Sequence, residues 1–458
     1  MNTTALRQGV VLACLAVAGC GFAVSANAQG TGEAASASAS QAVESRRDAL
    51  FAAMLTDPSN LDIAFEYATL SAQLGDFEAA IGTLERMLIY APNLPRIQLE
   101  LGVLYYRIGA TEMARSYLEA AEVSTAPPEV RERVATFLAQ VDRQDRRFLV
   151  SGTAYAGIRY QSNATAAPGE DVIAINGVPV RLDQNARAQA DGNLFGLADI
   201  HMTYDLKNQY DLIEANLVTY GSVFFDVERL NLGLVEAQLG PSFGFGRFGF
   251  AQTRLGVYGI AGATGLDQAL YTTTYGAGAV LRTAFAEGVL FETRNEFRAA
   301  NYNDSPAYPT VRLQTGQEYS SLNNLTVSLS PQVLMQTVVT GRRVDARAGF
   351  KSYGELGASL RGTYFFYMPE FGPLAADAPW NASLAVGGLL RRFDDPDVLI
   401  NAAASEKDEA AWIEAGISAP LQRGFSAFFT AQYTRQWSNY DTRDYDNAVF
   451  TFGLSRRF

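Results

Sequence analysis

The residues with the clearest potential for chemistry are Asp199, His201 and Thr203, which alternate along one predicted β-strand. Side chains two residues apart on a strand point to the same face, so a carboxylate, an imidazole and a hydroxyl would lie together. Nucleophilic catalysis needs an activated nucleophile beside such a base. No serine accompanies the set, and His201 is the chain's single histidine. We therefore favour a polar lining of a lumen and predict that the protein is not an enzyme.

The sequence also argues against a metal site or a cofactor. Cys14 and Cys20 are the two cysteines, so the chain beyond them offers no thiolate ligand and no disulfide. A single histidine makes a zinc site improbable, and no glycine-rich phosphate loop is present. Acidic residues gather in 395–408 and 439–445, but acidic outer loops bind calcium nonspecifically. We predict no cofactor.

The charge balance excludes nucleic acid as a partner. The formal net charge is −12. Residues 1–28 contribute only Arg7, so their removal would leave the mature chain at −13. A surface this acidic repels phosphate over most of its area.

The N-terminus has the organisation of an export signal. Arg7 precedes an apolar stretch over residues 9–24, and Ala26-Asn27-Ala28 forms an A-x-A cleavage site before Gln29. The apolar stretch is too short to span a membrane as a helix. We expect residues 1–28 to be a signal peptide and the protein to leave the cytoplasm.

A second cleavage site competes with the first. Val17-Ala18-Gly19-Cys20 resembles a lipobox, which would make Cys20 a lipidated N-terminus. We prefer cleavage after Ala28, because a barrel that is itself embedded in the membrane needs no acyl anchor. Residues 29–41 (QGTGEAASASASQ) are rich in alanine, serine and glycine and are predicted to be a flexible linker.

Residues 42–145 repeat with a period of 34. Pro58 and Pro92 are separated by this interval, as are Ala80 and Ala114. It is the period of the tetratricopeptide repeat, a helix–turn–helix unit. The second unit keeps the family's characteristic small and aromatic positions at Leu101, Gly102, Tyr105, Ala114 and Ala121. We predict a periplasmic tetratricopeptide-repeat domain over 42–145, with two full repeats, a preceding half repeat and a capping helix at 128–145.

Repeats of this kind commonly bind polypeptide in a concave groove, and a structural spacer is the alternative. The groove is lined by the first helix of each unit. The positions that would face it are Phe65, Thr69, Gln73, Leu99, Val103, Tyr106 and Arg107.

From Phe148 onward the hydrophobic period becomes two residues, which is typical of β-strands with one apolar face. We count about fourteen such segments of roughly 10 to 16 residues, as a membrane barrel requires. The chain is thus predicted to be an α+β multidomain protein, a short helical solenoid followed by an antiparallel transmembrane β-barrel over 148–458. The predicted strands are 148–161, 193–206, 211–225, 231–244, 248–262, 270–285, 289–303, 315–330, 333–346, 353–367, 381–394, 409–420, 424–438 and 446–458.

The connections between these segments support an assignment of inside and outside. If the helical domain is periplasmic, the first strand runs outward, and outer loops should be longer than inner turns. The pattern holds apart from a proline-rich inner connection at 368–380. Predicted outer loops include 162–192, 263–269, 304–314 and 395–408, and predicted inner turns include 207–210, 245–247 and 286–288.

The last strand resembles the outer-membrane targeting signal that the barrel-assembly machinery reads. Thr451, Gly453 and Phe458 occupy the polar, glycine and terminal aromatic positions. Arg456 departs from the penultimate aromatic. The localisation expected is the bacterial outer membrane, with its lipids around the barrel.

One short segment after the first strand gives a more specific resemblance. Residues 161–168 read QSNATAAP, with Ser162 and Asn163 following an aromatic residue at Tyr160. Such a segment, placed behind tetratricopeptide repeats and before about fourteen strands, resembles the surface lipoprotein assembly modulator (Slam) family. The resemblance implies that the repeats engage an exported client and that the barrel moves lipoproteins or soluble proteins to the cell surface.

Three functions are compatible with these features. The first is Slam-like translocation of a periplasmic polypeptide, for example a lipoprotein. The second is a polysaccharide-export porin that passes a glycan, since such porins also couple these repeats to barrels. The third is an outer-membrane scaffold whose repeats dock a periplasmic partner.

Overall fold

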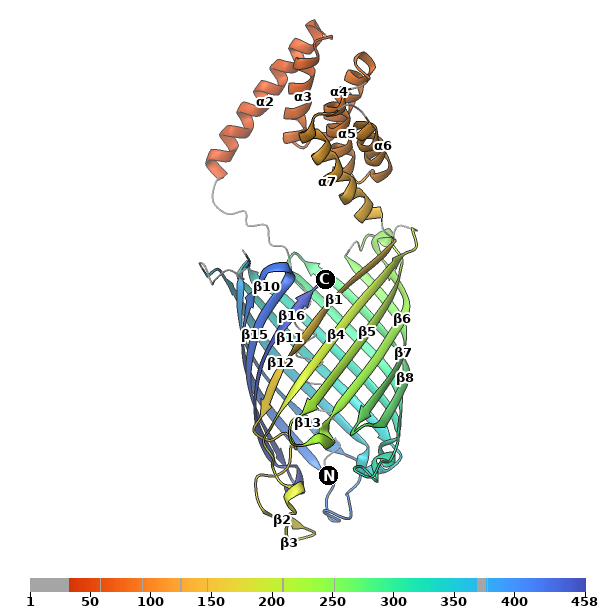
Figure 1. Cartoon of the computed structure of the whole chain (residues 1–458), viewed down its shortest axis with the longest axis vertical. Helices are drawn as coiled ribbons and strands as arrows, with labels where there is room; N and C mark the ends of the chain where they lie inside the picture. Colours follow the sequence, from red (N-terminus) through yellow and green to blue (C-terminus); the bar gives the residue numbers. More distant parts are fainter. Residues whose placement is uncertain are drawn as a thin grey trace. The chain divides into compact units, whose positions relative to one another are not determined.

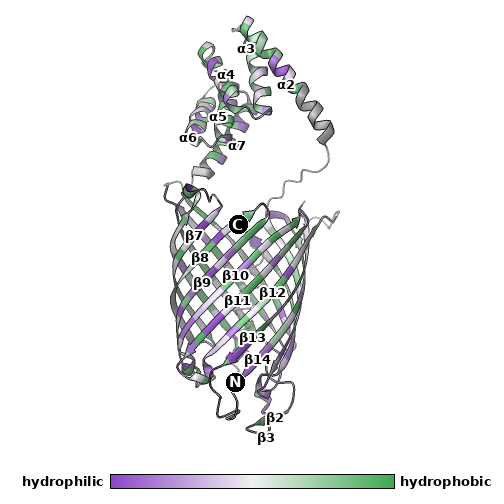
Figure 2. Cartoon of the chain, turned by 180° about the vertical axis from the view of Figure 1, so that it is seen from behind, coloured by the Kyte–Doolittle hydropathy of each residue, from purple (hydrophilic) through white to green (hydrophobic). Residues whose placement is uncertain are grey.

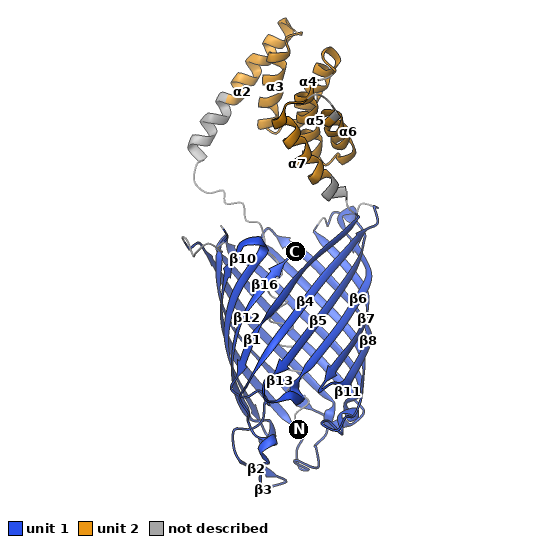
Figure 3. Cartoon of the chain, in the orientation of Figure 1, with its two compact units in different colours: residues 1–26, 147–458 blue, residues 27–146 orange. Residues whose placement is uncertain are grey.

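The computed structural model describes residues 33–458 apart from 58, 93, 124–125, 146, 208–209, 251, 369–375 and 377. These residues form two compact units: the first along the chain is helical and ends before Arg147 (orange in Figure 3), and the second is the barrel from Arg147 to Phe458 (blue in Figure 3). The predicted signal peptide lies outside the described residues, with Cys20, Ala26, Ala28 and Gln29. Pro58 and most of the connection 368–380 lie outside them as well.

The described part of the first unit consists of six helices that repeat in pairs (Figure 1). α3 and α5 begin 34 residues apart, and so do α4 and α6, which confirms the tetratricopeptide period. Each helix pair turns at a glycine with positive φ, Gly75 at 82° and Gly109 at 78°, a conformation that favours a residue without a Cβ. The helices are α2 (Glu33–Thr56), α3 (Leu61–Gln73), α4 (Phe77–Tyr90), α5 (Pro95–Arg107), α6 (Thr111–Val123) and α7 (Pro128–Asp145).

Local sequence explains where these helices start. Asn60 and Asp76 cap α3 and α4 by accepting hydrogen bonds from the N–H groups of Ile63 and Ala79. Helix α2 begins at Glu33, so residues 33–41, predicted to be a flexible linker, are helical. Alanine-rich composition favours the helix there. None of the described helices is both long and apolar enough to cross a membrane.

Two hydrophobic clusters hold the helical unit together. One cluster spans the four helices α2, α3, α4 and α5 and includes Leu50, Ala80 and Leu84. The other joins α5, α6 and α7. The alanines shared by the repeats, Ala80 and Ala114, are fully buried. A larger side chain at either position would overpack the contact between helices.

The second unit is a closed antiparallel barrel of 14 strands, which confirms the predicted fold class. Each barrel strand pairs with its neighbours in sequence, and β1 pairs with β16 to close the barrel. The strands are β1 (Phe148–Gln161), β4 (Asp191–Asp205), β5 (Leu212–Phe224), β6 (Leu232–Gly244), β7 (Thr253–Leu266), β8 (Ala269–Ala286), β9 (Val289–Tyr302), β10 (Gly316–Ser330), β11 (Val333–Ala346), β12 (Tyr353–Phe366), β13 (Trp380–Phe393), β14 (Lys407–Pro420), β15 (Phe425–Ser438) and β16 (Tyr445–Arg457).

One predicted strand was misplaced. β7 was expected at 248–262 but lies at Thr253–Leu266, so the inner turn is longer than 245–247 and the outer loop shorter than 263–269. Asp267 and Gln268 both have positive φ and make a tight hairpin at the outer end. Phe248 and Phe250, which seemed to continue the strand's alternation, are exposed aromatic residues of the inner turn.

The outer face of the barrel is apolar, as a membrane-spanning barrel requires. Exposed side chains on that face include Ile158, Leu194 and Leu356, and Figure 2 shows apolar residues recurring along the strands. Exposed aromatic rings gather at the inner end, defined as the end where β1 begins. They are Phe248, Phe250, Phe285 and Tyr367, the composition of an interfacial aromatic girdle.

The first outer loop carries a small hairpin of its own, β2 (Val172–Ile175) paired with β3 (Val178–Arg181). Its tip is Asn176-Gly177, both with positive φ. The Asn176 side chain donates to the carbonyl of Val398 at 3.0 Å and accepts from the amide of Ala402 at 2.8 Å. The hairpin is therefore fastened to the loop between β13 and β14.

Candidate functional site: the barrel lumen and the helical groove

The lumen encloses a cavity of about 810 Å³ whose wall is mostly polar side chains and glycine. Asp199, His201 and Thr203 all line it, as their spacing on β4 predicted. Nε2 of His201 lies 3.8 Å from a carboxylate oxygen of Glu214, which is too long for a hydrogen bond. The three residues thus contribute to a polar wall rather than to a nucleophile–base pair in contact.

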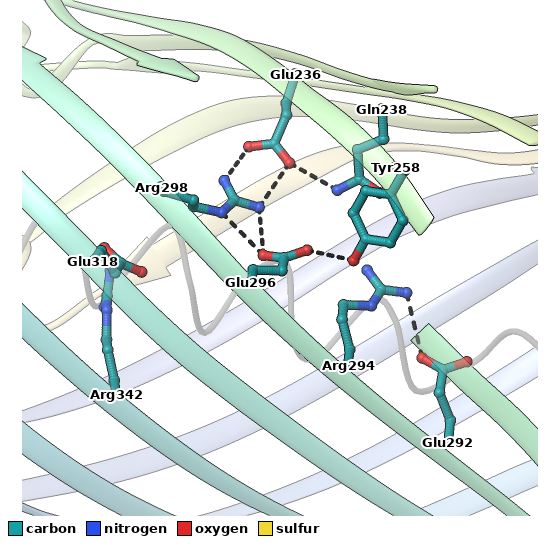
Figure 4. A network of polar contacts seen from close by, with 9 residues as sticks. All are labelled: Glu236, Gln238, Tyr258, Glu292, Arg294, Glu296, Arg298, Glu318 and Arg342. Carbon is teal, nitrogen blue, oxygen red and sulfur yellow. Dashed lines mark hydrogen bonds and ion pairs between the residues drawn. The ribbon is translucent and has the colours of Figure 1, made fainter. Parts of the chain in front are cut away.

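Next to this cavity, arginine–carboxylate pairs form a network that Gln238 and Tyr258 of the cavity wall join (Figure 4). On β9, Arg298 donates to Glu296 at 3.0 Å and also reaches Glu236 on β6, at 3.0 Å. The phenol of Tyr258, on β7 between them, donates to Glu296 at 2.8 Å. Gln238 donates to Glu236 at 3.0 Å. One guanidinium therefore links strands that do not pair with each other.

A second group of the same kind lies on neighbouring strands. Arg282 on β8 pairs with Glu214 on β5 at 3.0 Å and with Glu292 on β9 at 3.1 Å. Arg294 also donates to Glu292, at 3.3 Å. Because each of these carboxylates has a cation beside it, the wall is rich in charge but close to neutral locally.

The remaining strands continue the arrangement. Arg342 pairs with Glu318 at 2.7 Å, and Arg361 with Glu414 at 2.9 Å. Arg391 on β13 pairs with Glu355 on the adjacent β12. These arginines and glutamates were not predicted to form a site, although their recurrence at alternate positions of consecutive strands was an available signal.

Aromatic rings lie flat against the lumen wall over glycines of the neighbouring strand. A Cβ added at Gly278 would come within 2.7 Å of the Tyr258 ring, and one at Gly387 within 2.5 Å of the Trp412 ring. Both rings border the cavity. Glycine at these positions lets each ring occupy the space where a side chain would otherwise stand.

The acidic outer loops do not form a metal site within the described residues, where no group of three metal-binding side chains occurs. Their buried carboxylates have cationic partners instead. Glu406 is 3.3 Å from Arg443, and Asp397 is 4.0 Å from Lys351. These loop carboxylates stabilise the outer end of the barrel.

In the helical unit, five of the seven predicted groove residues have accessible surface. Thr69, Gln73 and Arg107 are exposed, whereas Phe65 and Tyr106 are half-buried. The prediction is wrong for Leu99 and Val103, which are 0% and 5% exposed. They pack with Leu118, Val134 and others in the core formed by α5, α6 and α7. The capping helix α7 therefore covers this face of α5.

Two further groove-side contacts were not predicted. The Arg96 guanidinium lies 4.8 Å from the centre of the Phe65 ring, and Tyr106 meets Phe137 of α7 edge to face at 6.2 Å. These contacts are favourable cation–π and aromatic geometries. They fix the half-buried rings beside the exposed side chains of Thr69, Gln73 and Arg107. The Thr69 hydroxyl donates to the carbonyl of Phe65 at 2.8 Å.

Asn163, in the segment that carried the family resemblance, fastens the first outer loop to β16. It is 4% exposed. Its amide nitrogen donates to the carbonyls of Ala167 at 2.8 Å and Asp446 at 3.1 Å, and its backbone N–H donates to Asn447 at 3.0 Å. The motif holds the outer end of the β1–β16 junction together.

The residues of the predicted targeting signal lie along the same junction, from Thr451 through Gly453 to Phe458 at its inner end. Gly453 stands opposite Gly157, and Thr451 is buried opposite Arg159. Phe458 exchanges two backbone hydrogen bonds with Gly152, at 3.0 and 3.1 Å. The signal residues therefore form part of the strand that closes the barrel.

No family model and no curated protein matches this chain. A structure titled "Bacterial polysaccharide outer membrane secretin" is 10% identical, covering 69% of this chain and all of that one, with a TM-score of 0.34. The outer membrane channel DcaP of Acinetobacter baumannii is also 10% identical, covering 68% of this chain and 97% of that one, with a TM-score of 0.37. The type III secretion translocator chaperone SycD of Yersinia enterocolitica is 17% identical, covering 23% and 75%, with a TM-score of 0.22.

Proposed function

We propose that this protein exports a polypeptide across the bacterial outer membrane, in the manner of the Slam family. The helical unit receives the client in the periplasm, and the barrel delivers it to or across the membrane. The observation that carries the proposal is the direct connection between the two parts. Helix α7 ends at Asp145 and strand β1 begins at Phe148, so the helical repeats continue along the chain into the first strand of the barrel.

The chemistry of both parts is compatible with this role. Thr69, Gln73 and Arg107 offer hydrogen-bonding groups beside the aromatic rings of Phe65 and Tyr106. Such mixed surfaces bind extended polypeptide through side-chain and backbone contacts. The polar lumen provides hydrogen-bonding groups throughout the membrane thickness, where an unsatisfied backbone would be costly.

In this proposed role the protein resides in the outer membrane and catalyses no reaction. The signal peptide directs export, and the terminal strand ending in Phe458 is read by the barrel-assembly machinery. The helical unit then lies in the periplasm. The protein works without enzymatic activity or cofactor, and any transport draws on binding and folding free energy or on other partners.

Deletion of residues 42–145 tests this function. Surface display of a co-encoded exported client, measured by protease accessibility on whole cells, is expected to be lost. A second variant carries Gln73→Ala and Arg107→Ala. It should reduce surface display of the client while the helices stay folded. Both proteins must retain the gel mobility of a folded barrel. Unchanged display in the deletion would overturn the proposal.

Glycan export is the second candidate, and one observation favours it. Tyr258 and Trp412 line the cavity together with arginine and glutamate, a combination suited to the apolar faces and hydroxyls of sugar rings. Conductance of the purified protein in planar bilayers distinguishes glycan export from polypeptide export. A steadily open pore that a neutral oligosaccharide blocks supports glycan export, and a closed lumen supports polypeptide handling.

A further inference from the structure

Strand β1 is paired along its whole length on one side but not on the other. β4 pairs with every residue of β1, from Phe148 to Gln161. β16 pairs with Thr153–Gln161, and its last contact is the exchange of hydrogen bonds between Phe458 and Gly152. Among the residues that the structure describes, none pairs with 148–151 on this side, so they form an edge in a barrel that is otherwise closed.

The direction of the backbone groups along this edge follows from strand geometry. Gly152 bonds toward β16, and successive residues alternate, so the N–H and C=O groups of Val150 and Phe148 point the same way. Arg147 accepts from Asp205 at 2.7 Å and so belongs to the β4 side. Within the described residues, the backbone of Val150 and Phe148 has no partner on the β16 side.

We propose that this edge of β1 binds an extended polypeptide segment, which adds to the barrel as a short strand past Phe458. Two donors and two acceptors at two-residue spacing match the backbone of another strand. A glycan has no such regular pattern of amides. Because β4 already holds residues 148–151 extended, little conformational entropy is lost on the barrel's side.

The side chains around the edge fit such an occupant. Phe148, Leu149, Val150 and Phe458 are all about half exposed and apolar, on both faces of the strand. An added strand would cover them with its own alternate side chains, as in other cases of strand addition. A free strand edge flanked by apolar side chains also favours pairing with another chain over solvation.

The inference rests on the proposed function for the identity of the occupant. The edge begins at Phe148, the first strand residue after the helical unit along the chain. The opposite end of the same junction is fastened by Asn163, which bonds Asp446 and Asn447 of β16. Strand addition is thus confined to the inner end.

The test uses the full chain in detergent micelles and a synthetic eight-residue peptide of alternating threonine and valine. Hydrogen–deuterium exchange of residues 148–151 is measured with the peptide and with a control peptide whose alternate amides are N-methylated. The first peptide is expected to slow exchange at the Val150 and Phe148 amides. The N-methylated peptide, which cannot complete the ladder, should leave it unchanged.

A proline variant tests the same edge from the protein's side. Val150→Pro removes a donor that faces the edge and leaves the pairing with β4 intact. It should weaken binding of the threonine–valine peptide about fivefold to tenfold, the effect of one net hydrogen bond. Val150→Ala keeps the donor and should bind within about twofold of the unmodified protein. Both variants are checked for folded-barrel gel mobility.

Equal protection by both peptides, or none by either, would overturn the inference. A failure of the edge inference can be distinguished from a failure of the proposed export function. If deletion of 42–145 leaves client display unchanged but the peptide still protects Val150, the edge binds polypeptide and the export proposal fails. If display depends on 42–145 but no protection occurs, the edge inference alone fails.

Discussion

Arginine is well suited to the lumen network because one planar guanidinium can bond two carboxylates at once. Arg298 does so with Glu236 and Glu296, and Arg282 with Glu214 and Glu292. In each case one of the two links, Arg298 to Glu236 or Arg282 to Glu214, joins strands that are not neighbours in the sheet. Such links restrain the barrel wall beyond what the backbone ladder achieves.

Replacing Arg298 by methionine should therefore destabilise the barrel. The change leaves two mostly buried carboxylates without a cation, and breaking a buried ion pair costs about 3–5 kcal/mol. Urea unfolding in lipid vesicles measures the loss. Arg343→Met is the control, because its partners Asp345 and Asp394 lie at the exposed outer end and such pairs contribute about 0–1 kcal/mol. Equal losses in the two variants would contradict the argument.

Glycine in β6 allows a second residue-level comparison. A Cβ at Gly240 would lie 1.9 Å from the carbonyl oxygen of Val257, whereas one at Gly233 meets nothing within 4 Å. Gly240→Ala should lower the free energy of unfolding by about 1–3 kcal/mol or more, since backbone must move. Gly233→Ala should change it little. Urea unfolding in lipid vesicles measures the free energy of unfolding of both variants. A Gly240→Ala barrel as stable as the unmodified protein would be inconsistent with the close approach of the Val257 carbonyl to Gly240.

At the scale of elements, the position of α7 determines which face of α5 can bind a partner. Leu99 is buried under α6 and α7, so Leu99→Ala should destabilise the helical unit by about 2–5 kcal/mol. Gln73→Ala, at an exposed position, should be within about 0.5 kcal/mol of the unmodified protein. Thermal unfolding followed by circular dichroism measures both. A stable Leu99→Ala unit would restore Leu99 as a groove residue.

The contact between α4, α5 and α6 gives the helical unit a pH dependence at high pH. Tyr105 and Tyr117 both donate to Glu85, at 2.7 and 3.2 Å. The hydrogen bond to Glu85, together with burial, raises the pKa of Tyr105 to about 12. The folded state then retains a proton that the unfolded state loses near pH 10, so stability falls as pH rises from about 10 to 12.

Tyr105→Phe should flatten this fall, because the residue no longer titrates. The measurement is the thermal midpoint of the helical unit at several values of pH between 9 and about 12, with tyrosinate absorbance recorded in parallel. Tyr90→Phe, at an exposed tyrosine, is the control and should keep the steep fall. The same slope in both variants would show that Glu85 does not hold the Tyr105 proton.

For the whole molecule, the decisive contact is the junction of β1 with β16, because it closes the barrel. Asn163 holds the outer end of this junction through three hydrogen bonds to β16 and its own loop. Asn163→Ala would leave buried backbone carbonyls unsatisfied, at a cost of about 1–3 kcal/mol. The folded band on semi-native gels should therefore disappear at a lower temperature. Asn295→Ala, which loses one exposed contact to Thr293, should behave like the unmodified protein.

The sequence alone determined the features that depend on local periodicity. A 34-residue repeat specified paired helices, and a two-residue alternation specified fourteen strands, because burial of one face forces those periods on neighbouring residues. It also placed Asp199, His201 and Thr203 in the lumen. It misplaced β7, where Phe248 and Phe250 of an aromatic turn imitated the strand pattern.

Only the tertiary structure decided the contacts between residues far apart in the chain. The pairing of Arg282 with Glu214, the burial of Leu99 beneath α7 and the fastening of Asn163 to β16 depend on helix packing and on the register of barrel closure. So does the edge at Phe148–Ser151, which exists because β16 ends before β1 does. Local periodicity sets which way a side chain faces, but register sets what it meets.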